Sequence, residues 1–277
     1  MKRWLEKLKP LSVGIGVITV IIFWANFLIP DSYSQTNNVK CPDSSTIAVL
    51  QIRGVIVEDD GQYDFIASPA ERIVKRLKEI GDTPSIKALV LDIDSTGGSM
   101  VAADEIVGEL KSIPDKAKVA IIRNNGDSAA YYIASAADKI YANAFSDIGA
   151  IGITMSFTET DDSGIYQALS SGKYKDVFAP GYHLTQDDRN MVLRQVDDSA
   201  QTMIGRIAEN RHMPVADIAK LADGSTLNGT QAKRVGLVDE IGGIDEVLAG
   251  LGLTEAQKGN VCEMDGFTTP ESVGRSN

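Results

Sequence analysis

The sequence predicts an α/β protein with a mostly parallel sheet, and three observations support this prediction. First, apolar runs such as "IKALVLDID" (86–94) are continuous, which is typical of strands buried on both faces. Second, turns of glycine and small residues follow two of these runs, as "STGGS" (95–99) and "NGDSAA" (125–130). Third, the order strand, turn, helix, strand recurs along the chain, and this order favours parallel strands joined by helices.

The predicted elements follow one another from residue 46 onward. "TIAVLQIRGVIV" (46–57) predicts a strand pair or one bent strand. "SPAERIVKRLKEI" (68–80) predicts a helix, because a serine occupies the capping position and apolar residues recur at helical spacing. The remaining predictions are a strand at 86–94, a helix at 100–113, a strand at 118–123, a helix at 128–138, a strand at 139–144, a long helix from about Thr185 and a shorter helix at 214–223 that begins with proline.

The first 30 residues have the pattern of a membrane anchor. Residues 1–10 carry four basic side chains and one acidic side chain, and the 21 residues from Pro10 to Pro30 carry no charge. As a helix, such a segment spans about 30 Å of hydrocarbon, and the positive-inside rule places the N-terminus in the cytoplasm. A cleaved signal peptide is the alternative, but its apolar region would be unusually long and no Ala-x-Ala site follows it.

We therefore predict a cytoplasmic N-terminus at 1–10, a transmembrane signal anchor at 11–30, a linker at 31–45, one folded domain at 46–262 and a flexible tail at 263–277. This is the organisation of a single-pass protein of the cytoplasmic (inner) membrane with its folded domain on the extracytoplasmic side. The whole chain carries a net charge of −11, and residues 1–10 carry about +3, so the remainder is strongly acidic and nucleic acid is not an expected partner. Export would permit a disulfide between Cys41 and Cys262, although two remote cysteines are equally compatible with free thiols.

Two of the predicted turns, at 94–100 and 125–132, are candidates for a catalytic site. Sites in open α/β sheets form at the carboxyl ends of the strands. Backbone N–H groups at such turns can stabilise an oxyanion, and glycine allows a substrate carbonyl to approach closely. An ordinary strand-to-helix turn explains "STGGS" equally well when that motif is considered alone.

Ser128 has three interpretations. It stands where a helix N-cap is expected, and a nucleophile there would lie at the positive end of the helix dipole. A variant of the Gly-x-Ser-x-Gly elbow would need a histidine base, but His183 and His212 are the only histidines and neither occupies a recognisable catalytic loop. Two histidines and two distant cysteines also make a metal site an unfavoured prediction.

A lysine can replace histidine as the base when its surroundings lower its pKa enough to leave the amine neutral. "SSGKYKDVFAP" (170–180) supplies Lys173 and Lys175. The two side chains would point the same way in an extended segment, but not in every turn. Lysines in a surface loop are usually just solvated, so the spacing alone does not assign a base.

Four motifs in order resemble the signal peptide peptidase A family, whose members are membrane-anchored Ser/Lys peptidases of the Clp protease/crotonase fold. The motifs are "LDIDSTGGSM" (91–100), "GDSAAYYIASAADKIYANAFSDIGAIGI" (126–153), "SGKYKDVFAP" (171–180) and "ADGSTLNGTQAKRVGLVDEIGGIDE" (222–246). The resemblance covers roughly Thr46 to Leu248. It implies a Clp protease/crotonase-like fold preceded by an N-terminal transmembrane helix.

The resemblance also implies roles for individual residues. Ser128 in "SAAYY" matches the family's nucleophile, and Lys175 in "GKYKD" matches its general base, which leaves Lys173 without a catalytic role. The implied backbone positions are Gly98 and Ala129 as oxyanion-hole donors and Gly97 as a substrate-binding residue.

The chain departs from the family pattern at five positions near these motifs. Thr96 replaces a common proline, Asp127 replaces a small residue, and Ala129 and Ala130 replace two glycines. Ala150 takes the place of a serine that commonly hydrogen-bonds the lysine. A carboxylate facing the site would raise the pKa of the lysine. These departures favour an alternative in which the chain is a catalytically impaired, membrane-tethered scaffold of the same fold.

The function we predict from the sequence is that of a membrane-anchored serine endopeptidase acting on signal-peptide remnants or other membrane-proximal peptides, without a cofactor or metal ion. An acyl-CoA enzyme of the crotonase fold is a weaker alternative, because export removes the domain from cytosolic CoA. The length of the domain resembles the half-length form of the family, in which neighbouring subunits of a ring contribute the serine and the lysine. The resemblance thus predicts a homo-oligomer with shared sites.

Overall fold

The computed structural model describes residues 41–113, 115–158, 169–252 and 260–268, all within the unit Cys41–Asn277. The anchor predicted at 11–30 and most of the linker predicted at 31–45 lie outside these residues. Within the described ranges, no helix is both long and apolar enough to cross a membrane.

A nine-stranded sheet forms the centre of the unit, as the apolar runs predict. All pairings are parallel except the one between β6 and β7, so the prediction of an α/β protein with a mostly parallel sheet is confirmed. The strands are β1 (Ile47–Val57), β2 (Ala67–Pro69), β3 (Ala88–Gly98), β4 (Ala117–Asp127), β5 (Lys139–Ala142), β6 (Asp147–Gly149), β7 (Thr226–Asn228), β8 (Glu240–Ile241) and β9 (Val261–Asp265). The main path runs β2-β1-β3-β4-β5-β8, with β9 also on β1 and β6 and β7 continuing from β4.

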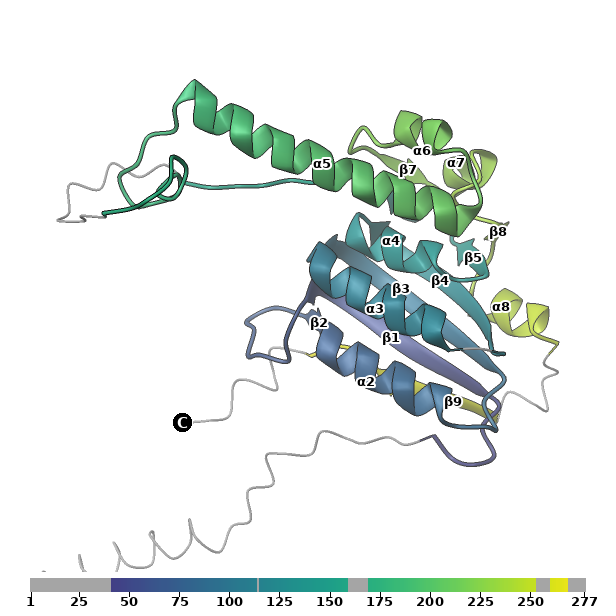
Figure 1. Cartoon of the computed structure of the whole chain (residues 1–277). Coiled ribbons are helices and arrows are strands. Elements are labelled where there is room, and N and C mark those ends of the chain that lie inside the picture. Colours follow the sequence, from purple (N-terminus) through teal and green to yellow (C-terminus); the bar gives the residue numbers. More distant parts are fainter. Residues whose placement is uncertain (1–40, 114, 159–168, 253–259, 269–277) are drawn as a thin grey trace, which may run out of the picture. The chain divides into compact units, whose positions relative to one another are not determined.

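Helices α2 (Ala70–Gly81), α3 (Met100–Ser112) and α4 (Ala129–Ser135) cover one face of this sheet (Figure 1). The long helix α5 (Gln186–Arg211) begins after Thr185 as predicted, and its C-terminal part packs on α4 (Figure 1). Three shorter helices follow: α6 (Val215–Leu221), α7 (Gly229–Arg234) and α8 (Ile244–Gly250).

The two faces of the central strands bury different residues. Along β4, Ala120 and Ile122 join the core under the helices, whereas Val119 and Ile121 join a second cluster that includes residues of α8. Both sets are buried, which explains why the sequence of this strand is continuously apolar rather than alternating.

At the start of α2 the structure differs from the prediction. The N-cap residue is Pro69, with no side-chain cap, so the predicted serine cap is wrong. Ser68 belongs to β2 instead, and its hydroxyl accepts from the Arg53 N–H and donates to the Arg53 carbonyl, both at 2.8 Å. It thereby fastens β2 to β1 near Gly54, where the register with β3 shifts. Residues 47–57 thus form one bent strand.

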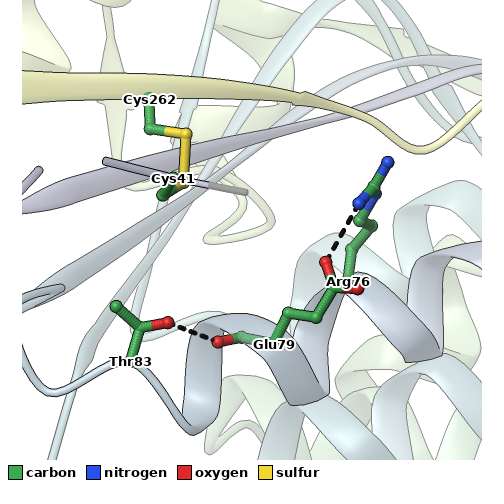
Figure 2. The surroundings of a disulfide bond; sticks show 5 residues. All are labelled: Cys41, Arg76, Glu79, Thr83 and Cys262. Atoms are coloured by element: carbon green, nitrogen blue, oxygen red, sulfur yellow. Dashed lines mark hydrogen bonds and ion pairs between the residues drawn. A yellow bond between two sulfur atoms is a disulfide. The ribbon is translucent and has the colours of Figure 1, made fainter. Parts of the chain in front are cut away.

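A disulfide joins Cys41 to Cys262 of β9, so the free-thiol alternative is not what the structure contains (Figure 2). The two Cα atoms lie 5.5 Å apart across a sequence separation of 221 residues. Regular structure continues beyond Cys262, where the flexible tail was expected to begin: β9 runs to Asp265, and the N–H of Thr268 donates to the carbonyl of Ala67. The reason is that the backbone of β1 and β2 offers bonding partners to this segment, which its own sequence does not reveal.

Candidate active site

Ser128 lies between the end of β4 and the start of α4, in an unusual backbone conformation. Its φ is 54° and its ψ is −122°, a combination that residues other than glycine rarely adopt. Two hydrogen bonds hold it there: its N–H donates to the Gly149 carbonyl at 2.6 Å, and its carbonyl accepts from the Tyr132 N–H at 3.0 Å. Strain of this kind persists only where the surroundings fix it, and it is common at active sites.

The Ser128 side chain does not cap α4. Ser128 occupies the N-cap position of α4, as predicted, but its side chain makes no hydrogen bond to the helix N–H groups. Within the described part of the chain, its hydroxyl has no hydrogen-bond partner, and the residue is half-buried rather than covered. By contrast, Ser99 accepts from the Ala102 N–H at the start of α3, as a capping serine does. Ser128 therefore presents a free hydroxyl at a strained turn.

Gly97 packs directly against this turn. It has a φ of +95°, and a Cβ added to it would lie 2.9 Å from the Cβ of Ser128 and 2.8 Å from the Asp127 carbonyl. At Gly98, with a φ of +150°, an added Cβ would lie 2.1 Å from the carbonyl oxygen of Ile56. Both positions therefore require glycine, and the "TGGS" motif is more than an ordinary strand-to-helix turn.

The structure also assigns a role to Ser95, which the sequence did not single out. Its hydroxyl accepts from the Gly97 N–H at 3.1 Å and donates to the Gly54 carbonyl at 2.6 Å. Because the Gly97 N–H is engaged, Gly98 is the better placed of the two glycines to donate to a substrate. The N–H of Ala129, the other predicted donor, belongs to the first residue of α4, where no acceptor exists within the helix.

Both strands that carry these turns are longer than predicted. β3 continues to Gly98 and β4 continues to Asp127, whereas the sequence placed their ends near Asp94 and Asn124. The additional residues of β4 pair with the short strand β6, from Asn125 with Asp147 to Asp127 with Gly149. This pairing, rather than an early turn, fixes the position of Ser128.

Asp127 is a buried carboxyl group immediately before Ser128. One oxygen accepts from the Asn125 amide at 3.2 Å, and the other, Oδ1, is buried with no partner in the described part of the chain. Burial raises the pKa of this carboxyl, and the nearby charge of Asp147 raises it further, against the hydrogen bond from Asn125. The departure from a small residue at this position thus places a buried ionisable group directly before Ser128.

The two candidate lysines have different surroundings. The Lys173 amine pairs with Asp187 and lies 5.0 Å from the ring centroid of Tyr174. Lys175 is exposed, and its amine has no partner among the residues that the structure describes. Both belong to a series of turns before α5 rather than to an extended segment. Lys175 is therefore the lysine that remains available.

Within one subunit, Lys175 and Ser128, both among the described residues, form no hydrogen bond with each other. α4 and α5 meet near their C-terminal ends, where the Asn210 amide donates to the Ser135 hydroxyl at 2.9 Å. Since the 26 residues of α5 span about 39 Å and α4 only about 10 Å, the start of α5 lies at least about 15 Å from Ser128. The turns that carry Lys175 adjoin that distant end of α5 (Figure 1).

Other candidates have structural roles or lack the required group. His212 is the C-cap of α5, with a left-handed φ of 53°. Ala150 follows the Gly149 carbonyl that holds Ser128, so it lies beside the turn but offers no hydroxyl. Within the described ranges, no three His, Cys, Asp or Glu side chains gather in a way that could hold a metal ion.

Comparison with known proteins adds an independent line of evidence. The family model of peptidase family S49 matches residues 111–257, more than half of the chain. A protein of Methanocaldococcus jannaschii, provisionally named as a protease, is 27% identical over 254 residues, which are 88% of this chain and 81% of that protein.

Two further relatives carry more specific names. A protein of Enterococcus faecium, provisionally named signal peptide peptidase SppA, is 28% identical over 74% of this chain and 62% of its own length. Protease 4 of Haemophilus influenzae is 28% identical over 73% of this chain, but the match spans only 34% of that protein. The resemblance expected from the four motifs is confirmed, and the chain belongs to peptidase family S49, the family of these signal peptide peptidases.

Proposed function

We propose that the protein is a serine endopeptidase with Ser128 as its nucleophile. The observation that carries this proposal is the conformation of Ser128, which is strained, held by its neighbours on both sides and left with a free hydroxyl. A serine needed only as a cap would use its hydroxyl on the helix. Attack of this hydroxyl on a peptide carbonyl would form an acyl-enzyme and release the amine.

Lys175 of a neighbouring subunit is the proposed general base. It would accept the Ser128 proton and return it to the leaving amine. The N–H groups of Gly98 and Ala129 would donate to the oxyanion, and Gly97 would allow the peptide backbone to approach. The exposed position of Lys175 and the free amine support a role outside its own subunit. A homo-oligomer with sites shared between subunits follows from this proposal.

The proposed substrates are extended peptides close to a membrane, such as remnants of signal peptides. The uncharged segment from Pro10 to Pro30 supports an anchor in the cytoplasmic membrane, with the catalytic domain on its outer side. If this is right, the protein stays in the membrane fraction after a carbonate wash. Recovery as a soluble form that begins between Ser32 and Gln35 would instead indicate a cleaved signal peptide.

An impaired scaffold of the same fold is the second candidate. Ala150 and Asp127 favour it, since one removes a hydroxyl from the site and the other adds a buried carboxyl. A scaffold would bind peptides without cleaving them. It would also have no reason to keep a strained serine with a free hydroxyl.

Labelling with a fluorophosphonate probe separates these candidates. We expect the wild-type protein to be labelled and Ser128→Ala to remain unlabelled at the same folded concentration. Ser112→Ala, at the far end of α3, is the matched control and should be labelled like the wild type. Absence of labelling in a correctly folded wild-type protein would reject the serine peptidase proposal.

A further inference from the structure

Ser95 is a buried serine whose hydroxyl connects β1 to β3 beside the proposed site. The residue is 1% exposed, and its hydroxyl donates to the Gly54 carbonyl at 2.6 Å and accepts from the Gly97 N–H at 3.1 Å. Both partners are backbone groups, one on each strand. A buried hydroxyl used in this way holds the course of the backbone, and its removal leaves a buried N–H without an acceptor.

Ser95 lies where the register of β3 shifts against both neighbouring strands. Against β1, the pairing moves from Asp94 to Gly97, three residues along β3, while β1 advances only two. Against β4, the pairing reaches Ser95 with Gly126 after β4 has advanced four residues and β3 only two. Irregularities of this kind redirect a strand and are common next to active sites. Ser95 therefore belongs to the segment that brings the glycine turn level with the end of β4.

The glycine turn that follows is held by one hydrogen bond on each side. Before it, the Gly97 N–H is bound by the hydroxyl of Ser95, and after it the Ser99 N–H donates to the Ile56 carbonyl at 2.9 Å. Gly97 is buried, whereas Gly98 is exposed. Two adjacent glycines with φ values of +95° and +150° have access to many other conformations, so these two bonds limit how the peptide between them is oriented.

We propose that Ser95 is a positioning residue for the oxyanion hole. By holding the Gly97 N–H, its hydroxyl keeps the next N–H, that of Gly98, available on the exposed side of the turn. This inference rests on the proposed function, in which the Gly98 N–H donates to the oxyanion. Gly97 also links Ser95 to the nucleophile, since an added Cβ at Gly97 would lie 2.9 Å from the Cβ of Ser128. Loss of the hydroxyl should therefore disturb the donor and its distance from Ser128 together.

The test is the kinetics of Ser95→Ala in the assembled protein, with fluorescein-labelled casein as the substrate. An oxyanion donor acts mainly in the transition state, so kcat should fall by at least about 10-fold while KM changes by less than about twofold. Fluorophosphonate labelling should slow by a similar factor, because the phosphoryl oxygen enters the same hole during attack. An unchanged kcat, or a rise in KM alone, would overturn the inference.

Ser68→Ala is the matched control. Ser68 is 0% exposed, and its hydroxyl also accepts from a backbone N–H and donates to a backbone carbonyl of β1, both of Arg53. These bonds lie one residue from Gly54 but go to β2 and β1 rather than to the glycine turn. Both alanine variants should lose stability, whereas only Ser95→Ala should lose kcat. An equal fall in kcat would assign the effect to a general loosening of β1 and would reject the inference.

A second readout does not depend on activity. Amide hydrogen exchange in residues 96–100 should be faster in Ser95→Ala than in the wild type, because the Gly97 N–H has lost its acceptor, and unchanged in Ser68→Ala. Unchanged exchange in Ser95→Ala would mean that the hydroxyl does not hold the turn. If Ser95→Ala does not fold, Ser95→Cys takes its place with the same expected results, since a thiol keeps the shape but hydrogen-bonds weakly.

Ser128→Ala, measured in parallel, keeps this test separate from the proposed function. If Ser128→Ala still hydrolyses casein, the proposed nucleophile is wrong and the inference falls with it. If Ser128→Ala is inactive and Ser95→Ala keeps the full kcat, only the inference falls.

Discussion

Asp92 lies within the apolar strand β3 and Ser128 follows the end of β4, but the two side chains differ in their hydrogen bonding. Asp92 is 3% exposed, and its carboxylate accepts from Arg123 at 2.8 and 3.0 Å and pairs with Arg53 at 2.9 Å. Its hydrogen-bonding capacity is used within the sheet, as a structural carboxylate requires. The hydroxyl of Ser128 is not used at all by the described residues, which is why we assign the chemistry to it.

Asp92 also gives a prediction for stability against pH. Burial alone would raise its pKa, but the hydrogen bonds and charges of Arg123 and Arg53 outweigh burial and hold the pKa below its ordinary value of 3.8. A lowered pKa stabilises the fold above about pH 4 and loses that contribution as the pH falls through the folded-state value. Asp92→Asn should therefore cost about 2 kcal/mol at pH 7, since both arginines remain partly hydrated.

Urea unfolding at a series of pH values measures this difference. The gap between wild type and Asp92→Asn should shrink as the pH is lowered below 3.8. Asp43→Asn, at an exposed position, should show no comparable gap. A gap that stays constant down to pH 3 would show that the charge of Asp92 is not what stabilises the sheet.

Gly97 gives a prediction for catalysis. In Gly97→Ala the new methyl group would lie 2.9 Å from the Cβ of Ser128, so the turn must move. A shift of about 1 Å at the proposed nucleophile should lower kcat by about 100-fold. Gly252→Ala is the matched control, because Gly252 also has a positive φ, +76°, but no atom lies within 4 Å of the added Cβ. Equal activity of the two variants would mean that the packing of Gly97 against Ser128 is unimportant.

At the scale of elements, the sequence predicted the long strands and helices but not the short strands that position the site. Apolar runs and glycine turns identify β3, α3, β4 and α4, since these signals are local. β6 and β7 contain three residues each, too few for a period, and they exist because they pair with distant segments. The same reason explains why the conformation of Ser128, which depends on Gly149, was not predictable.

The disulfide between Cys41 and Cys262 attaches β9 to the residues that precede β1. A cross-link that closes a loop of more than 200 residues limits the unfolded chain strongly, and loss of such a link typically costs about 2–5 kcal/mol. Cys41→Ser with Cys262→Ser should lower the unfolding temperature by about 5–10 °C while leaving the Ser128 turn intact. Thermal unfolding with and without a reductant measures this effect.

The reductant should bring the wild type to the unfolding temperature of the double variant and should not change the variant. An equal response of both proteins would show that the reductant acts elsewhere. A wild type that is unaffected by complete reduction would contradict a stabilising role for the bond.

At the scale of the whole molecule, the mostly parallel α/β sheet was predictable from the continuous apolar runs and the turns that follow them, and the family was predictable from four motifs that occur in order along the chain. The distance between Ser128 and Lys175 could not be predicted from their spacing in the sequence, because it depends on how α5 packs against α4. The 26 residues of α5 carry the turns of Lys175 away from the turn of Ser128. In the proposed assembly, each subunit therefore contributes Ser128 to one site and Lys175 to another.

The central claim, that Ser128 of one subunit works with Lys175 of another, is tested most directly by mixing inactive variants. Ser128→Ala and Lys175→Ala should each lose peptide hydrolysis, whereas Lys173→Ala should retain it. Subunits of the two inactive variants, unfolded and reassembled together, should recover activity, because some interfaces then pair an intact serine with an intact lysine. We predict recovery of up to about one quarter of the wild-type activity for random pairing at an equal ratio, with fluorophosphonate labelling confined to the Lys175→Ala subunits. No recovery in mixed assemblies of confirmed composition would contradict the shared site.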